Sequence, residues 1–308
     1  MYLYMIMEIS LGQIVECCKA AGDHTRLRLL ALCRLGDMSV GDLVDITEQS
    51  QPSISRHLKI LHSADLLERR QDGAFVFYRI GPAPAVQRFL DLIADTETTI
   101  KADQERYEQR ERARHEAIAQ HFAAHAKEWD ELRGSYLNAD EVDALLSNVI
   151  DEQKPKAVLD IGTGTGHILK IISRFAHDIA GIDISRDMLS LARKRLEGCV
   201  TDLRRADMNQ LPFEDDRFDL VTMHLSLRHA SRPDQAIKEA ARVLSRDGTL
   251  IVIDLEEGAG VSDDQHRSGL RKNDVENHMQ KAGMALQETK ALTSKSRRGY
   301  CWQGTKIS

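Results

Sequence analysis

Apolar and polar positions alternate at helical spacing over the first part of the chain. Residues 10–36 carry apolar side chains three and four positions apart, with a polar break at Asp23-His24. This spacing predicts two helices, because such positions share one helix face. Ser39 is a suitable N-cap for a third helix, which would begin at the next residue.

A fourth helix and a hairpin are predicted to follow. Pro52 suits the first turn of a helix that runs to about Leu61. Residues 66–80 then predict two strands joined by a turn at 71–73, where Asp-Gly is a hairpin signal. Helices, a turn, a further helix and a basic hairpin in this order are typical of a winged helix-turn-helix.

The helix that starts near Pro52 has the composition of a DNA-reading helix. Its apolar side chains Ile54, Leu58 and Leu61 would face the core, and short hydroxyls and basic groups would face outward. The alternative is a solvated helix face with charges for solubility. The predicted DNA contacts are Gln51, Ser53, Ser55, Arg56, His57, Lys59, Arg69 and Arg70.

The middle of the chain is rich in charge. Residues 94–133 mix acidic and basic side chains and lack proline and glycine, and Glu108 and Arg112 stand one helical turn apart. We therefore predict a DNA-binding domain over 1–93 and a helical linker over 94–117. The linker would be a semi-rigid spacer and would contribute to a dimer. The alternative is an exposed helix with no further role, and the two interpretations are compatible.

From residue 118 onward, short apolar runs alternate with helical patterns. Strands are expected at 158–161, 179–184, 203–207, 218–224 and 249–255. Strands that alternate with helices predict an α/β fold with a doubly wound, Rossmann-like parallel sheet over 118–308. Its ligand would bind at the carboxyl ends of the strands.

A glycine-rich loop follows the first of these strands. Gly162, Gly164 and Gly166 stand at alternate positions after Asp160, an acid placed to attract an ammonium or sulfonium group rather than a pyrophosphate. Asp183 ends the next strand, where a carboxylate accepts hydrogen bonds from ribose hydroxyls. A third acid, Asp207, is suitably placed for an adenine amino group. These features suit a cofactor with an adenosine end and a charged amino-acid end.

Length, charge and cysteine content limit the number of domains, the extent of a DNA-binding surface and the cellular compartment. A length of 308 residues allows two domains, and the net charge of −6 means that any DNA-binding surface is local. Five cysteines without a CxxC pair and the absence of a membrane-length apolar run favour a reducing cytoplasm with no membrane contact. The apolar start, residues 1–7, lacks the features of a signal peptide.

Residues 24–80 resemble the ArsR/SmtB family, above all at 24–27 (His-Thr-Arg-Leu) and at 51–61 (QPSISRHLKIL). The resemblance implies a dimeric repressor that binds operator DNA and responds to a ligand. Metal sensors of this family place Cys-x-Cys where residues 38–43 read MSVGDL. We therefore predict no metal site.

Residues 118–308 resemble class I S-adenosylmethionine-dependent methyltransferases, nearest to those of ubiquinone and menaquinone biosynthesis. The resemblance implies that Met188 packs on the adenine and that the Met208 backbone reads its edge. S-adenosylmethionine or S-adenosylhomocysteine is the expected cofactor; a degenerate fold without cofactor or an NAD site are the alternatives. The predicted cofactor residues are Asp160, Gly162, Thr163, Gly164, Gly166, Asp183, Ile184, Met188, Asp207, Met208 and His224.

The substrate side gives weaker signals. Residues 224–229 (HLSLRH) replace the Pro-Pro-aromatic motif of amino-methylating nucleic-acid enzymes. His224 and His229 are weak candidates for a base or substrate contact, and they are equally well explained as ordinary polar residues. Residues 256–269 lack the apolar run that a quinone-type acceptor would favour.

Three functions fit these patterns. The first is a transcriptional regulator that senses the cofactor or its product, acts as a homodimer and possesses optional methyltransferase activity. The second is an active small-molecule methyltransferase with an accessory DNA-binding domain. The third, a metalloregulator with an appended enzyme, lacks the expected ligands.

Overall fold

A computed structural model describes residues 10–72, 75–81, 83, 86, 90–91, 98–125, 136–199, 201–257, 269–293 and 298–307. The chain forms two compact units that divide between Ala113 and Arg114, inside the predicted linker, and each unit is described by itself. Gly73 of the predicted turn, the predicted boundary at 93–94, residues 1–7 and most of 256–269 lie outside the described residues.

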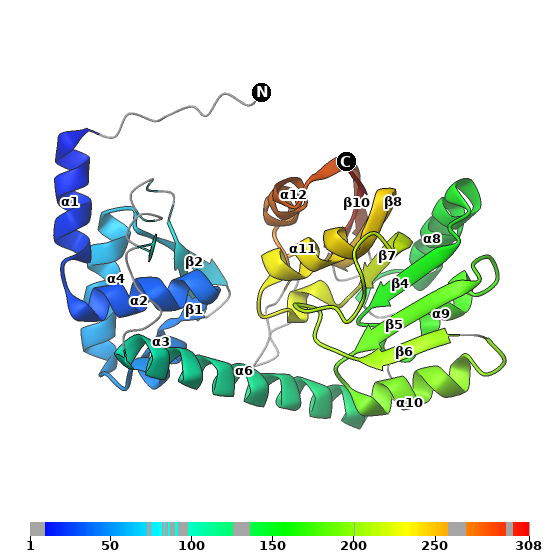
Figure 1. Ribbon diagram of the computed structural model, residues 1–308, viewed down its shortest axis with the longest axis horizontal. Helices are drawn as coiled ribbons and strands as arrows, with labels where there is room; N and C mark the ends of the chain where they lie inside the picture. The colour runs from blue at the N-terminus through cyan, green and yellow to red at the C-terminus, as the bar shows by residue number, and fades with distance from the viewer. Residues whose placement is uncertain are drawn as a thin grey trace. The chain divides into compact units, whose positions relative to one another are not determined.

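The first unit combines helices with a small antiparallel sheet of order β1-β3-β2 (Figure 1). Its elements are α1 (Leu11–Ala21), α2 (His24–Leu35), β1 (Met38–Ser39), α3 (Val40–Thr47), α4 (Gln51–Ser63), β2 (Leu67–Asp72), β3 (Phe75–Ile80) and the first part of α6 (Thr98–His125). This is the predicted order of helices and hairpin.

Local sequence explains where α3 and α4 begin. Ser39 caps α3: its hydroxyl accepts from the Asp42 N–H, and the Asp42 carboxylate accepts from the Ser39 N–H at 2.9 Å. Ser50 precedes α4, which has a proline in its first turn as predicted. The apolar side chains of α4 expected to face inward, Ile54, Leu58 and Leu61, are fully buried.

The second unit is an α/β domain. Its elements are α8 (Ala139–Gln153), β4 (Ala157–Ile161), α9 (His167–Ile172), β5 (Asp178–Asp183), α10 (Arg186–Arg195), β6 (Thr201–Arg205), β7 (Phe218–His224), the 3₁₀ turn η1 (Leu227–His229), α11 (Pro233–Val243), β8 (Leu244–Leu255), α12 (Lys272–Lys281), β9 (Met284–Thr293) and β10 (Arg298–Lys306).

The sheet of this unit has the order β6-β5-β4-β7-β8-β10-β9. The strands from β6 to β8 are parallel, which confirms the doubly wound prediction. The last two strands were not predicted, and β10 runs antiparallel to both of its neighbours. The order in which strands are added reverses between β4 and β7: β5 and β6 lie on one side of β4, and β7 and β8 lie on the other. The carboxyl ends of β4 and β7 therefore form the crevice where such sheets bind ligands.

Side chains that alternate along the strands fill two cores, one on each face of the sheet. Leu159 and Ile161 pack on the side covered by α11 and α12, whereas Val158 packs on the side covered by α8 and α9 (Figure 1). Because both faces are covered, the central strands are apolar on both sides. This burial holds the carboxyl ends of β4, β5 and β7 in place.

Candidate functional site

The glycine loop turns sharply at the carboxyl end of β4. Gly162 has φ +73°, and a Cβ added there would lie 2.5 Å from the Cβ of Ser226. The N–H groups of Gly162 and Thr163 both donate to the Ile182 carbonyl at 2.9 Å. The loop therefore packs closely against its neighbours and requires glycine at this position.

Asp160 lies at the base of this loop and is almost fully buried. The Thr222 hydroxyl donates to its Oδ1 at 2.7 Å. Burial raises the pKa of Asp160 to about 6, against the opposing effect of the hydrogen bond from Thr222. A buried carboxylate of this kind gains from a nearby cation.

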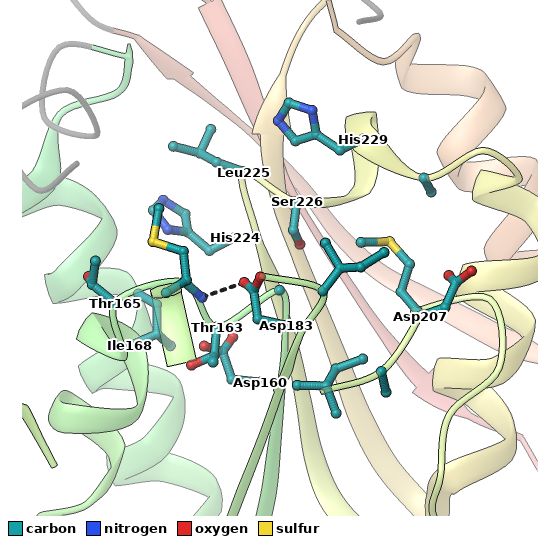
Figure 2. A pocket seen from close by; sticks show the side chains of 18 of the residues that line it. Asp160, Thr163, Thr165, Ile168, Asp183, Asp207, His224, Leu225, Ser226 and His229 are labelled. Carbon is teal, nitrogen blue, oxygen red and sulfur yellow. Dashed lines mark hydrogen bonds between the residues drawn. The ribbon is translucent and has the colours of Figure 1, made fainter. Parts of the chain in front are cut away.

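Asp183 ends β5 and faces the glycine loop (Figure 2). Its Oδ2 accepts from the Gly164 N–H at 2.9 Å and its Oδ1 from the Ser185 N–H at 2.8 Å. Burial raises the pKa of Asp183, although these backbone donors act in the opposite direction. A carboxylate has about four acceptor positions, so capacity remains for the two hydroxyls of a ribose.

Asp207 and Asn209 form another part of the wall. Asp207 Oδ1 accepts from the backbone N–H and the side-chain amide of Asn209, at 2.8 and 2.9 Å. Asn209 Oδ1 is buried and accepts no hydrogen bond from the described residues. A buried acceptor without a donor fits the amino group of an adenine.

These residues line one pocket of about 920 Å³, part of which is open to solvent. Ten of the predicted cofactor residues line it, and Gly166 does not. His224 and His229 reach it from the end of β7 and from η1 (Figure 2). The wall also includes residues that the sequence analysis missed, namely Thr165, His167, Ile168, Ile182, Ala206, Asn209, Leu225, Ser226 and Ala230.

His167 is the most distinctive of the missed residues. Its Nε2 lies 3.1 Å from a carboxylate oxygen of Asp143, which connects the start of α9 to α8. The position of His167 directly after the glycine loop was a signal in the sequence. Its partner, 24 residues earlier, had none.

The predicted DNA-reading face of α4 is largely solvent-accessible. Gln51, Ser55, Arg56 and Lys59 are exposed and Ser53 is half-buried. Arg69 on β2 is also exposed. Basic and short polar side chains therefore extend from the helix and from the adjacent strand, as contact with a DNA groove and backbone requires.

The structure corrects the predicted exposure of two of the proposed DNA contacts, His57 on α4 and Arg70 on β2. His57 is buried, with its Nδ1 3.7 Å from Asp23 Oδ1. Arg70 is buried, 3.5 Å from Asp37 Oδ2 and stacked over the Phe77 ring. Both side chains make contacts inside the unit, where they are not available to phosphates.

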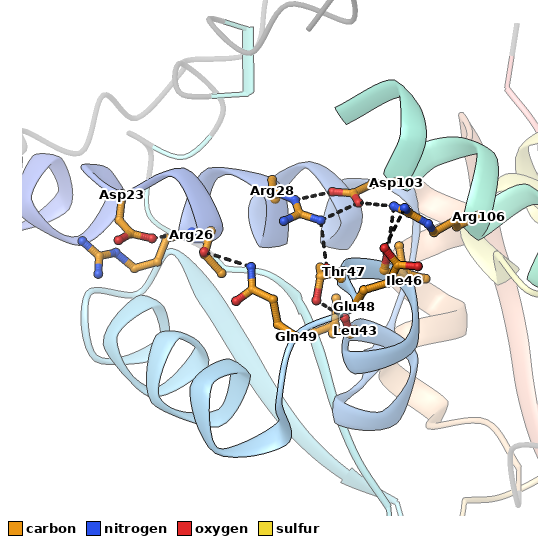
Figure 3. A network of polar contacts seen from close by, with 11 residues as sticks. Asp23, Arg26, Arg28, Leu43, Ile46, Thr47, Glu48, Gln49, Asp103 and Arg106 are labelled. Atoms are coloured by element: carbon orange, nitrogen blue, oxygen red, sulfur yellow. Dashed lines mark hydrogen bonds and ion pairs between the residues drawn. The ribbon is translucent and has the colours of Figure 1, made fainter. Parts of the chain in front are cut away.

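A polar network joins the start of α6 to α2 and α3 (Figure 3). Arg28 pairs with buried Asp103 and also donates to the Thr47 carbonyl at 3.2 Å. Arg106 pairs with Glu48 at 2.8 Å, and Arg110 pairs with Asp42 and Asp45. Helix α6 is thereby attached to the helix that precedes α4.

Family models match both units. Residues 23–69 match the bacterial regulatory proteins of the arsR family, and residues 159–252 match a methyltransferase domain. The chain joins an ArsR-type helix-turn-helix to a methyltransferase domain. The second match supports the predicted cofactor, S-adenosylmethionine or S-adenosylhomocysteine.

The methyltransferase segment also resembles curated enzymes. It is 37% identical over 109 residues to a demethylmenaquinone methyltransferase of Thermotoga maritima, which covers 35% of this chain and 47% of that protein. It is 38% identical over 102 residues to the ubiquinone/menaquinone biosynthesis C-methyltransferase UbiE of Laribacter hongkongensis, covering 32% and 42%. The chain thus spans less than half the length of these relatives.

A solved structure shares the fold of the second unit. The [4+2]-cyclase SpnF aligns with a TM-score of 0.53 and 20% identity over 62% of this chain and 95% of its own. That protein is named for a cyclisation, so the fold does not define the reaction.

The helices of the described residues include none with the length and apolar character of a membrane span. Within the same residues, no group of three or more His, Cys, Asp or Glu side chains is arranged to hold a metal ion.

Proposed function

We propose that this chain is a DNA-binding transcriptional regulator whose methyltransferase domain binds S-adenosylmethionine or S-adenosylhomocysteine and adjusts DNA affinity to the bound form. The observation that supports it most is the pocket, where Asp160, Asp183 and Asn209 offer acceptors suited to an ammonium, a ribose and an adenine. The same chain presents Arg56 and Lys59 on an exposed helix.

Regulation of this kind requires that the two ligands differ in how strongly they favour the DNA-binding conformation. A ligand shifts a conformational equilibrium only by its difference in affinity for the two states. S-adenosylmethionine carries a sulfonium charge that its product lacks. A buried acid such as Asp160 can respond to that charge, so the two forms can have different effects on the protein.

An active small-molecule methyltransferase is the second candidate. The similarity to curated methyltransferases supports it, and so does a pocket that retains all three predicted acids. Methyl transfer relies strongly on positioning of the acceptor, so the lack of an evident base does not count against it. The two functions are compatible in one chain.

We further propose that the working form is a homodimer on double-stranded DNA. Helix α1 exposes Leu11, Ile14 and Val15, of which Leu11 is 77% exposed. Adjacent exposed apolar side chains on one helix favour a protein partner, and a second copy would match the symmetry of a palindromic operator. Analytical ultracentrifugation of the full chain tests this, and a monomer at micromolar concentration contradicts it.

The test of the main proposal is a DNA-affinity titration. A duplex is first selected by the full chain from a random-sequence library, and its affinity is then measured by fluorescence anisotropy without ligand and with each ligand at saturation. We expect the two ligands to give different dissociation constants. Equal constants under all three conditions would contradict sensing.

A further inference from the structure

A buried chain of polar contacts leads from β8 to the pocket. Asp254 is fully buried near the end of β8, and its Oδ2 accepts from the Arg228 backbone N–H at 3.1 Å. Its Oδ1 accepts from Arg228 Nη1 at 3.2 Å and from the Leu255 N–H at 2.8 Å. These bonds hold the guanidinium in one orientation, and the Tyr136 ring packs on it with a centroid 5.1 Å away.

The Nε–H of Arg228, which does not contact Asp254, determines which nitrogen of His229 carries the proton. Arg228 Nε donates to His229 Nε2 at 3.1 Å. An arginine has no acceptor and keeps its protons, so the imidazole nitrogen must be the acceptor. The proton of the neutral ring is then on Nδ1. A second proton on Nε2 would face the Arg228 N–H, so this geometry also disfavours the doubly protonated ring.

His229 lies at the pocket, where a proton on Nδ1 could be donated to a bound molecule. Residues 225–230 follow β7 and pack against the glycine loop, where the Ser226 hydroxyl donates to the Ile161 carbonyl at 2.8 Å. The His229 backbone N–H donates to the Ser226 carbonyl at 3.0 Å, which holds η1 over the pocket. Figure 2 shows His229 and Leu225 on the opposite side of the pocket from Asp160.

We propose that His229 is a specificity-determining hydrogen-bond donor, and not a base, and that it binds an oxygen of the methyl acceptor through Nδ1–H. Arg228 and Asp254 are positioning residues that keep the ring in this tautomer. The acceptor class is a small molecule with an anionic or carbonyl oxygen beside the atom to be methylated. This inference rests on the proposed function, because it assumes that the cofactor occupies the side of the pocket near Asp160.

The tautomer is tested without any acceptor. Long-range proton–nitrogen spectra of the full chain, labelled with ¹⁵N-histidine and saturated with S-adenosylhomocysteine, distinguish the two neutral tautomers. His229 is assigned by the signals lost in His229→Asn. We expect an unprotonated Nε2. A ring protonated on Nε2 would overturn the inference.

Arg228→Lys is the matched variant for the positioning role. Lysine keeps a cation for Asp254 but has no Nε–H to donate to His229. We expect the His229 signals to shift toward a mixture of tautomers while the far-ultraviolet circular dichroism stays as in the wild type. Unchanged His229 signals in this variant would show that Arg228 does not set the tautomer.

The donor role is tested with 4-nitrophenolate as the probe, added to the protein saturated with S-adenosylhomocysteine. We expect His229→Leu to weaken its binding by about tenfold or more, because a hydrogen bond to an anion is lost. His229→Asn, whose amide keeps an N–H near the place of Nδ1, should restore most of the affinity. Equal affinities for wild type and His229→Leu, or no binding at millimolar concentration, would overturn the acceptor assignment.

The affinity for S-adenosylhomocysteine separates this inference from the proposed function. We expect it to be the same in wild type, His229→Leu and His229→Asn. A large loss of affinity for S-adenosylhomocysteine in His229→Leu would show that His229 binds the cofactor and not the methyl acceptor, which would overturn the inference. Absence of S-adenosylhomocysteine binding in the wild type would contradict the proposed function itself.

Discussion

Arg28 and Asp103 form a two-point ion pair between α2 and α6. Arg28 Nε lies 2.6 Å from Asp103 Oδ2 and Nη2 lies 2.7 Å from Oδ1, and the Asp103 side chain is only 2% exposed. Bidentate pairs of this kind are directional as well as strong. They prevent the start of α6 from rotating on the helices that support α4, and α6 continues unbroken to His125.

If the proposed regulation by ligand is correct, we expect the Arg28–Asp103 pair to be needed for the effect of ligand on DNA affinity. Asp103→Asn should reduce the free energy of unfolding of the first unit by about 2–3 kcal/mol, because it leaves a partly buried guanidinium without its counter-charge. It should also diminish the difference in DNA affinity between the two cofactor forms while leaving their own affinities unchanged. Anisotropy and calorimetry measure the two effects.

Arg112→Ala is the control, since Arg112 lies on the same helix and is exposed. It should change neither stability nor the response to ligand. A full ligand response in Asp103→Asn would show that α6 does not transmit the signal by this route.

The raised pKa of Asp160 predicts that the stability of the folded protein depends on pH. Its pKa is raised to about 6, so ionisation is penalised in the folded protein and the penalty is present above pH 6. For this group alone, stability falls as pH rises from about 4 to about 6. Asp160→Asn should therefore stabilise the protein at pH 7 by about 3 kcal/mol, given 1.36 kcal/mol per pKa unit and a rise from 3.8 to about 6.

Asp160→Asn should also weaken the binding of S-adenosylmethionine. Affinity for S-adenosylmethionine should fall in the wild type as pH drops through about 6, because protonation removes the negative charge. In Asp160→Asn the affinity for S-adenosylmethionine should be low and should not change between pH 5 and pH 8. Calorimetry from pH 5 to 8 measures it, and a wild-type affinity independent of pH would contradict the role of Asp160.

Arg56 predicts the energetics of DNA reading. Arg56→Ala should weaken binding to the selected duplex by about 1–3 kcal/mol and relax preference at one base position if the side chain reaches a base edge. Arg70→Ala instead removes a buried contact, so it should lower the melting temperature. If DNA affinity is unchanged by Arg56→Ala, the side chain makes no base contact.

Gly162 and Gly198 provide a matched pair for the glycine loop. Both have positive φ, but a Cβ at Gly162 meets Ser226 at 2.5 Å, whereas nothing lies within 4 Å of a Cβ at Gly198. Gly198→Ala should cost about 1 kcal/mol of stability from backbone strain alone. Gly162→Ala should cost more and abolish S-adenosylhomocysteine binding. Equal effects, measured by urea unfolding and calorimetry, would show that the close packing at Gly162 is unimportant.

The sequence predicted the strand, the glycine loop and the acids that line the pocket, because the signals for them are local. A strand, an acid, alternate glycines and a helix lie within a dozen residues around Gly162, and the structure places this set at the sheet crevice. Asp143 and His167 were missed as a pair because their contact depends on the packing of α8, which no spacing indicates. Strands β9 and β10 were not predicted, because polar and charged residues interrupt both and neither contains a long continuous apolar run.

His57 shows a signal that was present but overlooked. Ile54, His57, Leu58 and Leu61 stand at positions i, i+3, i+4 and i+7, so helical periodicity already places His57 on the buried face. Its polarity suggested an outward position. Arg70 carried no comparable signal, since Asp37 lies 33 residues earlier and the pair forms only in the folded unit.

Calorimetric titration of S-adenosylhomocysteine and S-adenosylmethionine into the full chain tests the central claim most directly. We predict saturable binding of both, loss of binding in Asp183→Ala, which removes the acceptor for the ribose, and wild-type affinity in Asp187→Ala, an exposed acid on α10. Undetectable binding of either compound to the wild type at millimolar concentration, or unchanged affinity in Asp183→Ala, would contradict it.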